Sequence, residues 1–150
     1  MIRMQMVKLA ACLSIASAAS AQEPSDRPSA LERLVQFEQV FEQCNAGLLD
    51  EITSEAWAGF GVRGQLSAAK AGAINQFRSF CENGMTFDFD VTINRHWAHH
   101  QVHTIAADFS GIMISTEGQP TPNNLRVTLI IAPDDTGTML IQHSHLSELR

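Results

Sequence analysis

The hydrophobic period of the chain changes once, near residue 84, and this change limits what the chain can fold into. Before it, apolar residues recur every three or four positions, which is typical of helices. After it, Phe87, Phe89 and Val91 alternate with polar residues, as in a strand with one buried face. Helices followed by consecutive strands favour an α+β fold in which the helices cover one face of an antiparallel sheet.

Three helices are expected in the first half of the chain. The segment Ser29-Ala30-Leu31-Glu32 is a capping box, which predicts a helix over about 29–45. A second, shorter helix is expected over about 47–57, before a segment rich in glycine. Beyond that segment, Ser67 is a suitable cap for a third helix that runs to about Glu82.

The second half predicts four strands separated by turn-forming residues. The strands are expected over about 87–94, 99–116, 125–132 and 138–147, with turns near 95–98, 117–123 and 133–137. In the long second strand, the segment Asp108-Phe109-Ser110-Gly111 suggests a bend or a bulge.

Composition narrows the class of protein. The chain has 150 residues, of which 45% are hydrophobic and 17% are charged, and this is typical of one globular domain rather than of a disordered chain. Three cysteines are too few for a disulfide-dense mini-protein. The formal net charge of −6 disfavours nucleic-acid binding, because an acidic chain repels phosphate. The sequence contains no tyrosine, which removes any mechanism that depends on a phenol.

The first 21 residues have the pattern of a secretory signal peptide. The cations Arg3 and Lys8 precede a short apolar stretch, and Ala19-Ser20-Ala21 is a cleavage site of small residues. The apolar stretch is much shorter than the about 20 residues that a membrane-spanning helix needs. We therefore expect cleavage after Ala21 and export, so that the protein is periplasmic or secreted.

The domain organisation follows from this signal. Residues 22–28 are polar, contain two prolines and predict a flexible leader, and residues 29–150 form one domain. The alternative is a lipoprotein, because Leu9-Ala10-Ala11-Cys12 is similar to a lipobox. Lys8 argues against it, since no hydrophobic run would precede the acylated cysteine.

Export bears on the two cysteines of the domain, Cys44 and Cys81, which both fall in predicted helices. An oxidising compartment permits a disulfide between them. The alternative is two buried free thiols, since unpaired cysteine is among the most buried residue types. The sequence leaves both alternatives open.

The C-terminal quarter carries a family resemblance. Arg126-Val127-Thr128 precedes the turn Pro133-Asp134-Asp135, and residues 139–147 then read M-L-I-Q-H-S-H-L-S. This order resembles the R-x-T, polar turn and W-x-I-x-H-x-H-x-S pattern of the SnoaL-like, polyketide-cyclase-like branch of the nuclear-transport-factor-two-like superfamily. Met139 stands where that family commonly has tryptophan. Gly72-Ala73-Ile74 is a looser match to the helical region of the family.

The resemblance implies a cystatin-like α+β cone, in which a strongly bent antiparallel sheet wraps around a pocket that about three N-terminal helices close. Family members use the pocket as isomerases, dehydratases, cyclases or hydrolases, or with no known reaction, so the fold does not fix the function. Relatives often pair through the sheet. The strand over 125–132 is apolar on both faces, and such a strand is usually covered twice, so we expect a homodimer through the sheet.

His145 is the leading candidate for chemistry. It matches the histidine of the family's last strand, and an imidazole can act as a general acid or base near neutral pH. Alternation predicts that Met139, Ile141, His143, His145 and Ser147 share one side of this strand, as a pocket wall would. The alternative is a structural histidine that hydrogen-bonds to a neighbouring strand or helix.

Two charged residues complete the candidate site. Asp108 is expected to be the catalytic partner of His145, provided that burial raises the pKa of its carboxyl. Arg126 could bind a substrate carboxylate in bidentate fashion, or could be a surface arginine paired with an acid. The remaining residues expected to bind a ligand are Thr128, Ile141, His143, Trp57 and Phe60. The two aromatic residues could instead belong to the core.

All six histidines lie in the strand half of the chain, which invites a metal site. His99 and His103 are about 13 Å apart along a strand, too far for one ion. His143 and His145 could converge on an ion, but no cysteine or carboxylate lies close in sequence to complete the set. We expect no metal and no cofactor. His96, His99 and His100 are expected to be strand-end residues near solvent.

Two functions remain open. The first is a binding or accessory module whose pocket takes a small apolar or carboxylate-bearing molecule, because the sequence shows no complete acid–base pair. The second is an isomerase, dehydratase or cyclase that uses His145 for proton transfer. A His–Asp pair converging on a cavity would favour the enzyme, whereas a collapsed pocket would favour the module.

Overall fold

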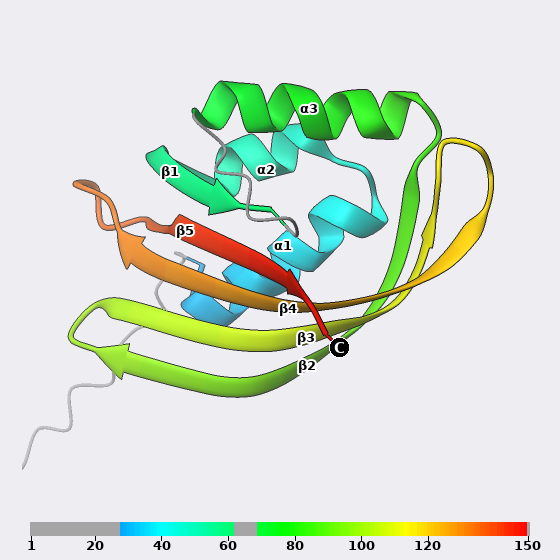
Figure 1. Ribbon diagram of the computed structural model, residues 1–150. Coiled ribbons are helices and arrows are strands. Elements are labelled where there is room, and N and C mark those ends of the chain that lie inside the picture. The colour runs from blue at the N-terminus through cyan, green and yellow to red at the C-terminus, as the bar shows by residue number, and fades with distance from the viewer. Residues whose placement is uncertain (1–27, 62–68, 150) are drawn as a thin grey trace, which may run out of the picture.

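The computed structural model describes residues 28–61 and 69–149, so the predicted signal peptide, most of the leader and Ser67 lie outside the described residues. The elements follow in the order α1 (Ala30–Glu42), α2 (Ala46–Ile52), β1 (Thr53–Phe60), α3 (Lys70–Glu82), β2 (Thr86–His99), β3 (Val102–Ile114), β4 (Pro120–Pro133) and β5 (Met139–Glu148). The helices lie together on one side of a strongly curved sheet (Figure 1). We call the sheet face toward the helices the inner face and the opposite face the outer face.

The sheet has five strands in the order β1-β5-β4-β3-β2. Strands β2 to β5 form an antiparallel meander, as expected. β1 pairs parallel with β5, so the sheet is mixed, and the prediction of a wholly antiparallel sheet is wrong on this point. A parallel pair needs a long connection, and α3 with three strands supplies it.

The capping box predicted at the start of α1 is confirmed. The Ser29 side chain accepts a hydrogen bond from the Glu32 amide at 3.2 Å, and the Glu32 carboxylate accepts one from the Ser29 amide. These two bonds satisfy amides that the first turn of a helix leaves without partners. The helix buries Leu34, Phe37 and Val40 against the sheet.

Residues 53–57, expected as the end of the second helix, form the first part of β1 instead. α2 ends at Ile52, and Thr53 takes extended backbone angles while its hydroxyl donates to the Leu49 carbonyl at 2.6 Å. The backbone partners of β1 lie on β5, about 90 residues further along the chain. Local preference could not reveal such a distant partner.

The turn expected near 95–98 is in fact a bulge inside a longer strand. β2 continues to His99, and Asn94 is an extra residue between the pairs Ile93–Ala107 and Arg95–Ala106. The chain reverses only at residues 100–101, where His100 has a φ of 53°. A bulge interrupts alternation as a turn does, which explains the mistaken position.

The loop expected over 117–123 is shorter than predicted, because β4 begins at Pro120. β5 pairs with β4 only from Leu125 onward, so the first residues of β4 have a neighbour on one side alone. A strand with a free edge tolerates proline, whose ring nitrogen cannot donate to a neighbour. Pro120 and Pro122 occupy this local edge.

The register across 108–111 is continuous, so no bulge occurs there. Gly111 nevertheless marks a close approach of two backbones. A Cβ atom at this position would lie 1.9 Å from the carbonyl oxygen of Asp88 on β2. Only glycine fits between strands that approach this closely.

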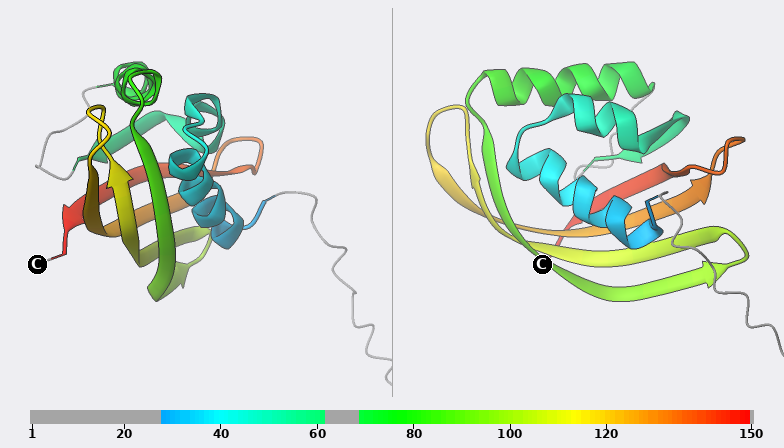
Figure 2. Two further views of the ribbon diagram at one scale, coloured as in Figure 1. Left: turned by 90° about the vertical axis from the view of Figure 1, so that its right-hand side faces the viewer. Right: turned by 180° about the vertical axis from the view of Figure 1, so that it is seen from behind.

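Six phenylalanine rings fill the space between α1, α3 and the inner face of β2 and β3. They are Phe37, Phe41, Phe77, Phe87, Phe89 and Phe109. Phe41 lies at their centre, with ring centroids 5.4 Å from Phe87 and 5.5 Å from Phe77, mostly edge to face. The views from the side and from behind show the sheet curving around the helices on its inner face (Figure 2).

Cys44 and Cys81 form a disulfide, with Cα atoms 5.6 Å apart. Cys81 lies in the last turn of α3, as expected, but Cys44 lies in the turn between α1 and α2. Its φ of 50° is a left-handed conformation that often ends a helix. The bridge therefore ties this turn to α3.

Over residues 28–61 and 69–149, no helix has the length and apolar character to span a membrane.

Candidate functional site

A bulge in β5 divides the residues that were expected to share one side of this strand. Ile141 pairs with Ile131, whereas His143 pairs with Ile130, which leaves Gln142 as the extra residue. The Gln142 side chain donates to the Ala132 carbonyl at 3.3 Å. One extra residue reverses the alternation beyond it. Met139 and Ile141 therefore share the inner face, whereas His143, His145 and Ser147 lie on the outer face, and the prediction of one shared side is wrong.

The outer face carries a hollow at the place where the two histidines come together with β4. The hollow has a volume of about 460 Å³, is open to solvent and is lined by Thr128, Ile130, His143 and His145. The strand pairing positions these side chains, since Thr128 lies opposite His145 and Ile130 lies opposite His143. Three of the predicted site residues thus meet at one place.

The buried neighbours of these residues point the other way. Along β4, Val127 and Leu129 are almost fully buried against the helices, while Thr128 and Ile130 between them are half-buried on the outer face. This alternation was predicted from the sequence and is confirmed. Ile130 was not named as a site residue, although its position between inward-facing residues was the signal that could have identified it.

Asp108 and Arg126 form an ion pair on the outer face, next to the hollow. They lie opposite each other on β3 and β4, with Arg126 Nε 3.0 Å and Nη2 3.4 Å from the two carboxylate oxygens. Hydrogen bonds from Arg126, and then from Asn94, hold the pKa of the Asp108 carboxyl below its ordinary value. The condition under which Asp108 was expected to act, a carboxyl pKa raised by burial, is therefore not met.

This ion pair does not provide His145 with a carboxylate partner. Asp108 is on β3 and His145 on β5, with β4 between them, so their backbones are separated by two strand spacings, more than about 9 Å. A carboxylate with a lowered pKa is also a weak base near neutral pH. The predicted His–Asp pair is not assembled, and Arg126 already has a carboxylate partner.

The other predicted ligand-binding residues lie away from the hollow. Ile141 is fully buried on the inner face. Trp57 is buried in the core, where its indole occupies the space that a side chain at Gly59 would need, since a Cβ there would lie 2.9 Å from the ring. For Phe60 the structure describes the backbone, which lies opposite His145 in the β1–β5 register, and not the side chain.

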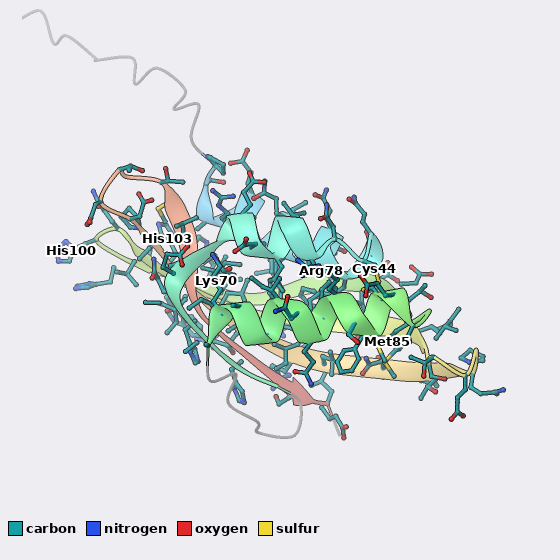
Figure 3. The ribbon with its side chains drawn as sticks, turned by 90° about the horizontal axis from the view of Figure 1, so that it is seen from above. Cys44, Lys70, Arg78, Met85, His100 and His103 are labelled. Carbon is teal, nitrogen blue, oxygen red and sulfur yellow. A yellow bond between two sulfur atoms is a disulfide. The ribbon has the colours of Figure 1, made fainter. Side chains whose placement is uncertain are left out.

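Two cations that the fold shields from solvent were not singled out by sequence reasoning: Arg33 is buried and Lys70 is half-buried. Arg33 on α1 is buried and donates from Nε to the Met139 carbonyl at 2.6 Å, which joins the helix to the start of β5. Lys70 begins α3, and its ammonium contacts the carbonyls of Asp50 and Thr53 at 2.8 and 2.9 Å, as well as the Asp50 carboxylate (Figure 3). Both side chains hold elements together, and neither lines the hollow.

The hollow combines polar and apolar side chains. It offers two imidazoles and one hydroxyl as hydrogen-bonding groups beside an apolar side chain. Within the described part of the chain, no three His, Cys, Asp or Glu side chains are grouped so that they could hold a metal ion together. The phenylalanine cluster lies under the helices, where the family resemblance implied a ligand pocket.

No protein-family model matches the chain, and no curated protein matches it. Solved structures do. A ketosteroid isomerase-like protein from Erwinia carotovora atroseptica superposes with a TM-score of 0.71 at 12% identity, over 79% of this chain and 92% of that one. A nuclear transport factor 2-like protein of unknown function in nutrient uptake from Rhodospirillum rubrum superposes with a TM-score of 0.70 at 11% identity, over 82% of this chain and 100% of that one.

A protein with a cystatin-like fold from Caulobacter vibrioides gives a TM-score of 0.63 at 9% identity, over 80% of this chain and 87% of that chain. Identities this low establish a shared fold and do not carry over an activity. They also do not distinguish the SnoaL-like branch, which stays a prediction. The chain has the nuclear-transport-factor-two-like, cystatin-like α+β fold that the sequence predicted.

Proposed function

We propose that this protein is an exported binding module whose ligand site is the hollow on the outer face of the sheet. The observation that carries the proposal is the meeting of His143, His145, Thr128 and Ile130 around a hollow of about 460 Å³. The hollow lies on the sheet face that the helices leave uncovered (Figure 2). Binding sites typically combine an apolar lining with a few polar groups that orient the ligand. The hollow has both.

The lining indicates the class of ligand. Two imidazoles and the Thr128 hydroxyl can donate to an oxygen-bearing group, and Ile130 can contact an apolar body. Arg126 lies two residues before Thr128 on β4, and it could exchange its Asp108 partner for a ligand carboxylate. The ligand is therefore a small apolar molecule or a small molecule that carries a carboxylate.

We propose further that two copies pair through their outer faces and that the second copy encloses the hollow. An open hollow gives a small ligand little burial, whereas a covering partner would remove both the ligand and the lining from water. The outer face of β2 and β3 exposes large apolar side chains, among them Trp97 (49% exposed), Val102 (45%) and Ile112 (46%). Exposed apolar residues gathered on one face are typical of a protein–protein interface.

Export is supported by the signal-peptide pattern and by the disulfide. Cys44 and Cys81 are bonded, and disulfides persist mainly in oxidising compartments outside the cytosol. We propose that the mature chain begins at Gln22 and acts in the periplasm or outside the cell. Mass spectrometry of the mature N-terminus tests this, and a chain that begins at a lipidated Cys12 would contradict it.

The decisive experiment is native mass spectrometry of tag-free protein purified from its own host. We expect a dimer that retains a small molecule. Ile130→Asp should weaken dimerisation by at least about tenfold, because it puts a charge into the centre of the interface. Val35→Asp is the matched control, since Val35 is 50% exposed on α1 and far from the outer face.

The outcomes separate the two parts of the proposal. A wild-type chain that stays monomeric at micromolar concentration contradicts the pairing. If the Ile130→Asp variant retains the ligand as well as the wild type does, the proposed position of the site is wrong.

The second candidate is an enzyme in which His145 transfers a proton. The shared fold with a ketosteroid isomerase-like protein and the two imidazoles in the hollow favour it. The engagement of Asp108 by Arg126 weighs against it. Conversion of the retained molecule by the wild type, lost in His145→Gln while binding persists, would favour the enzyme over the module.

A further inference from the structure

The hairpin of β2 and β3 brings together histidines that the sequence kept apart. Four of them lie at its end, at positions 96, 99, 100 and 103. Because the chain reverses at residues 100–101, His96 lies opposite Ile105 and His103 lies opposite Ala98, one diagonal step apart on the same face. Figure 3 shows His100 at the end of the hairpin and His103 closer to the body of the protein.

The imidazoles of His96 and His103 are in direct contact. Nε2 of His96 is 2.9 Å from Nδ1 of His103, and the ring centroids are 5.2 Å apart. A hydrogen bond between two ring nitrogens requires one of them to carry a proton and the other to offer a lone pair. At least one ring is therefore in the neutral form, which is the form that ligates metals.

We propose that His96 and His103 form a chelating site for a divalent transition-metal ion. With metal–nitrogen bonds of about 2.0–2.1 Å, two ligands at a right angle lie about 2.9 Å apart, which is the separation of these two nitrogens. Before the ion binds, the donor ring gives up the shared proton to solvent and holds a proton on its other nitrogen instead. Both rings then turn so that the two lone pairs point to one place beside the line between the nitrogens, where the ion binds. Water completes the coordination.

The backbone prepares this site before any metal arrives. Both residues lie within paired strands, so the ladder fixes the separation of their Cα atoms. His96 is exposed and His103 half-buried, so an ion can reach the pair from solvent. With two protein ligands, the site should follow the general order of affinity for divalent ions, with Cu²⁺ bound more tightly than Ni²⁺ or Zn²⁺.

Titration calorimetry of the tag-free, disulfide-bonded chain with CuCl₂ and then ZnCl₂, in a buffer that does not coordinate metals, tests the proposal. We expect one ion per chain, with Cu²⁺ bound more tightly than Zn²⁺. His96→Gln and His103→Gln should each weaken Cu²⁺ binding at least about tenfold, because each removes one of two chelating nitrogens. The matched control is His99→Gln, at the same end of the hairpin, which should change the affinity less than about threefold.

Electron paramagnetic resonance of the Cu²⁺ complex gives an independent readout, with two nitrogen ligands expected in the wild type and one in either variant. Circular dichroism checks that each variant is folded. Absence of binding at about 100-fold molar excess of metal over protein overturns the proposal. Loss of binding in a His143→Gln/His145→Gln variant, with His96→Gln unaffected, also overturns it, because it assigns the ion to the hollow.

Discussion

The inner and outer faces of the sheet come from the same strands and have different organisation. On the inner face, phenylalanine rings and aliphatic residues from the helices and strands fill the space, and Phe109, Leu129 and Ile141 are fully buried. On the outer face, the same strands carry an ion pair, exposed apolar side chains and an open hollow. The comparison indicates that stability depends mainly on the inner face, whereas the proposed binding site lies on the outer face.

The largest expected difference between the faces is in the cost of removing a large side chain. Phe109→Ala should lower the free energy of unfolding by about 3–5 kcal/mol, because it leaves a cavity among the packed rings. Ile112→Ala, on the outer face of the same strand, should cost less than about 1 kcal/mol, since Ile112 is 46% exposed. Urea denaturation measures both, and equal costs would remove the distinction between the faces.

The second effect concerns the disulfide on the helical side. Replacing Cys44 and Cys81 together with serine should lower stability by about 2–4 kcal/mol, because the bridge restricts the unfolded chain. Denaturation of the wild type with and without reductant should show a difference of the same size. The double variant should not respond to reductant, and a response would show that the effect of the reductant does not come from this bridge.

The third prediction tests the outer face at His145. Because this side chain is exposed, His145→Gln and His145→Ala should each cost less than about 1 kcal/mol, while ligand retention falls. Ile141→Ala, three pairs away on the inner face of the same strand, should cost about 2–5 kcal/mol. Thermal melts compare the three variants. A large loss for both His145 variants, with ligand retention unchanged, would assign His145 a structural role instead.

The smallest effect is the pH dependence of the ion pair. The hydrogen bond from Arg126 lowers the pKa of Asp108 below its ordinary value of 3.8, so folding favours the carboxylate. The pair stabilises the fold above that ordinary value, and this contribution is lost as the pH falls through the lower, folded pKa. In an NMR titration, Arg126→Gln should move the pKa of Asp108 upward toward 3.8. If the pKa of Asp108 does not move, Arg126 is not the main cause of its lowering.

Local features of the chain were predictable because they depend on residues that are close in sequence. The capping box at Ser29 and Glu32 needs only one helical turn. The turn between β4 and β5 needs only Asp134, whose carboxylate accepts from the amides of Thr136 and Thr138, and Gly137, with a φ of 80°. Both were read from the sequence and both are present.

The sequence by itself determined that helices precede a strand meander, that β4 is apolar on both faces and that His143 and His145 share a face. It could not determine the parallel pairing of β1, the closure of the disulfide or the face on which the two histidines lie. The reason is physical: a bulge such as those at Asn94 and Gln142 forms only when two strands pair, and it reverses every side chain beyond it. Only the tertiary structure therefore decided that the histidines lie outside the core.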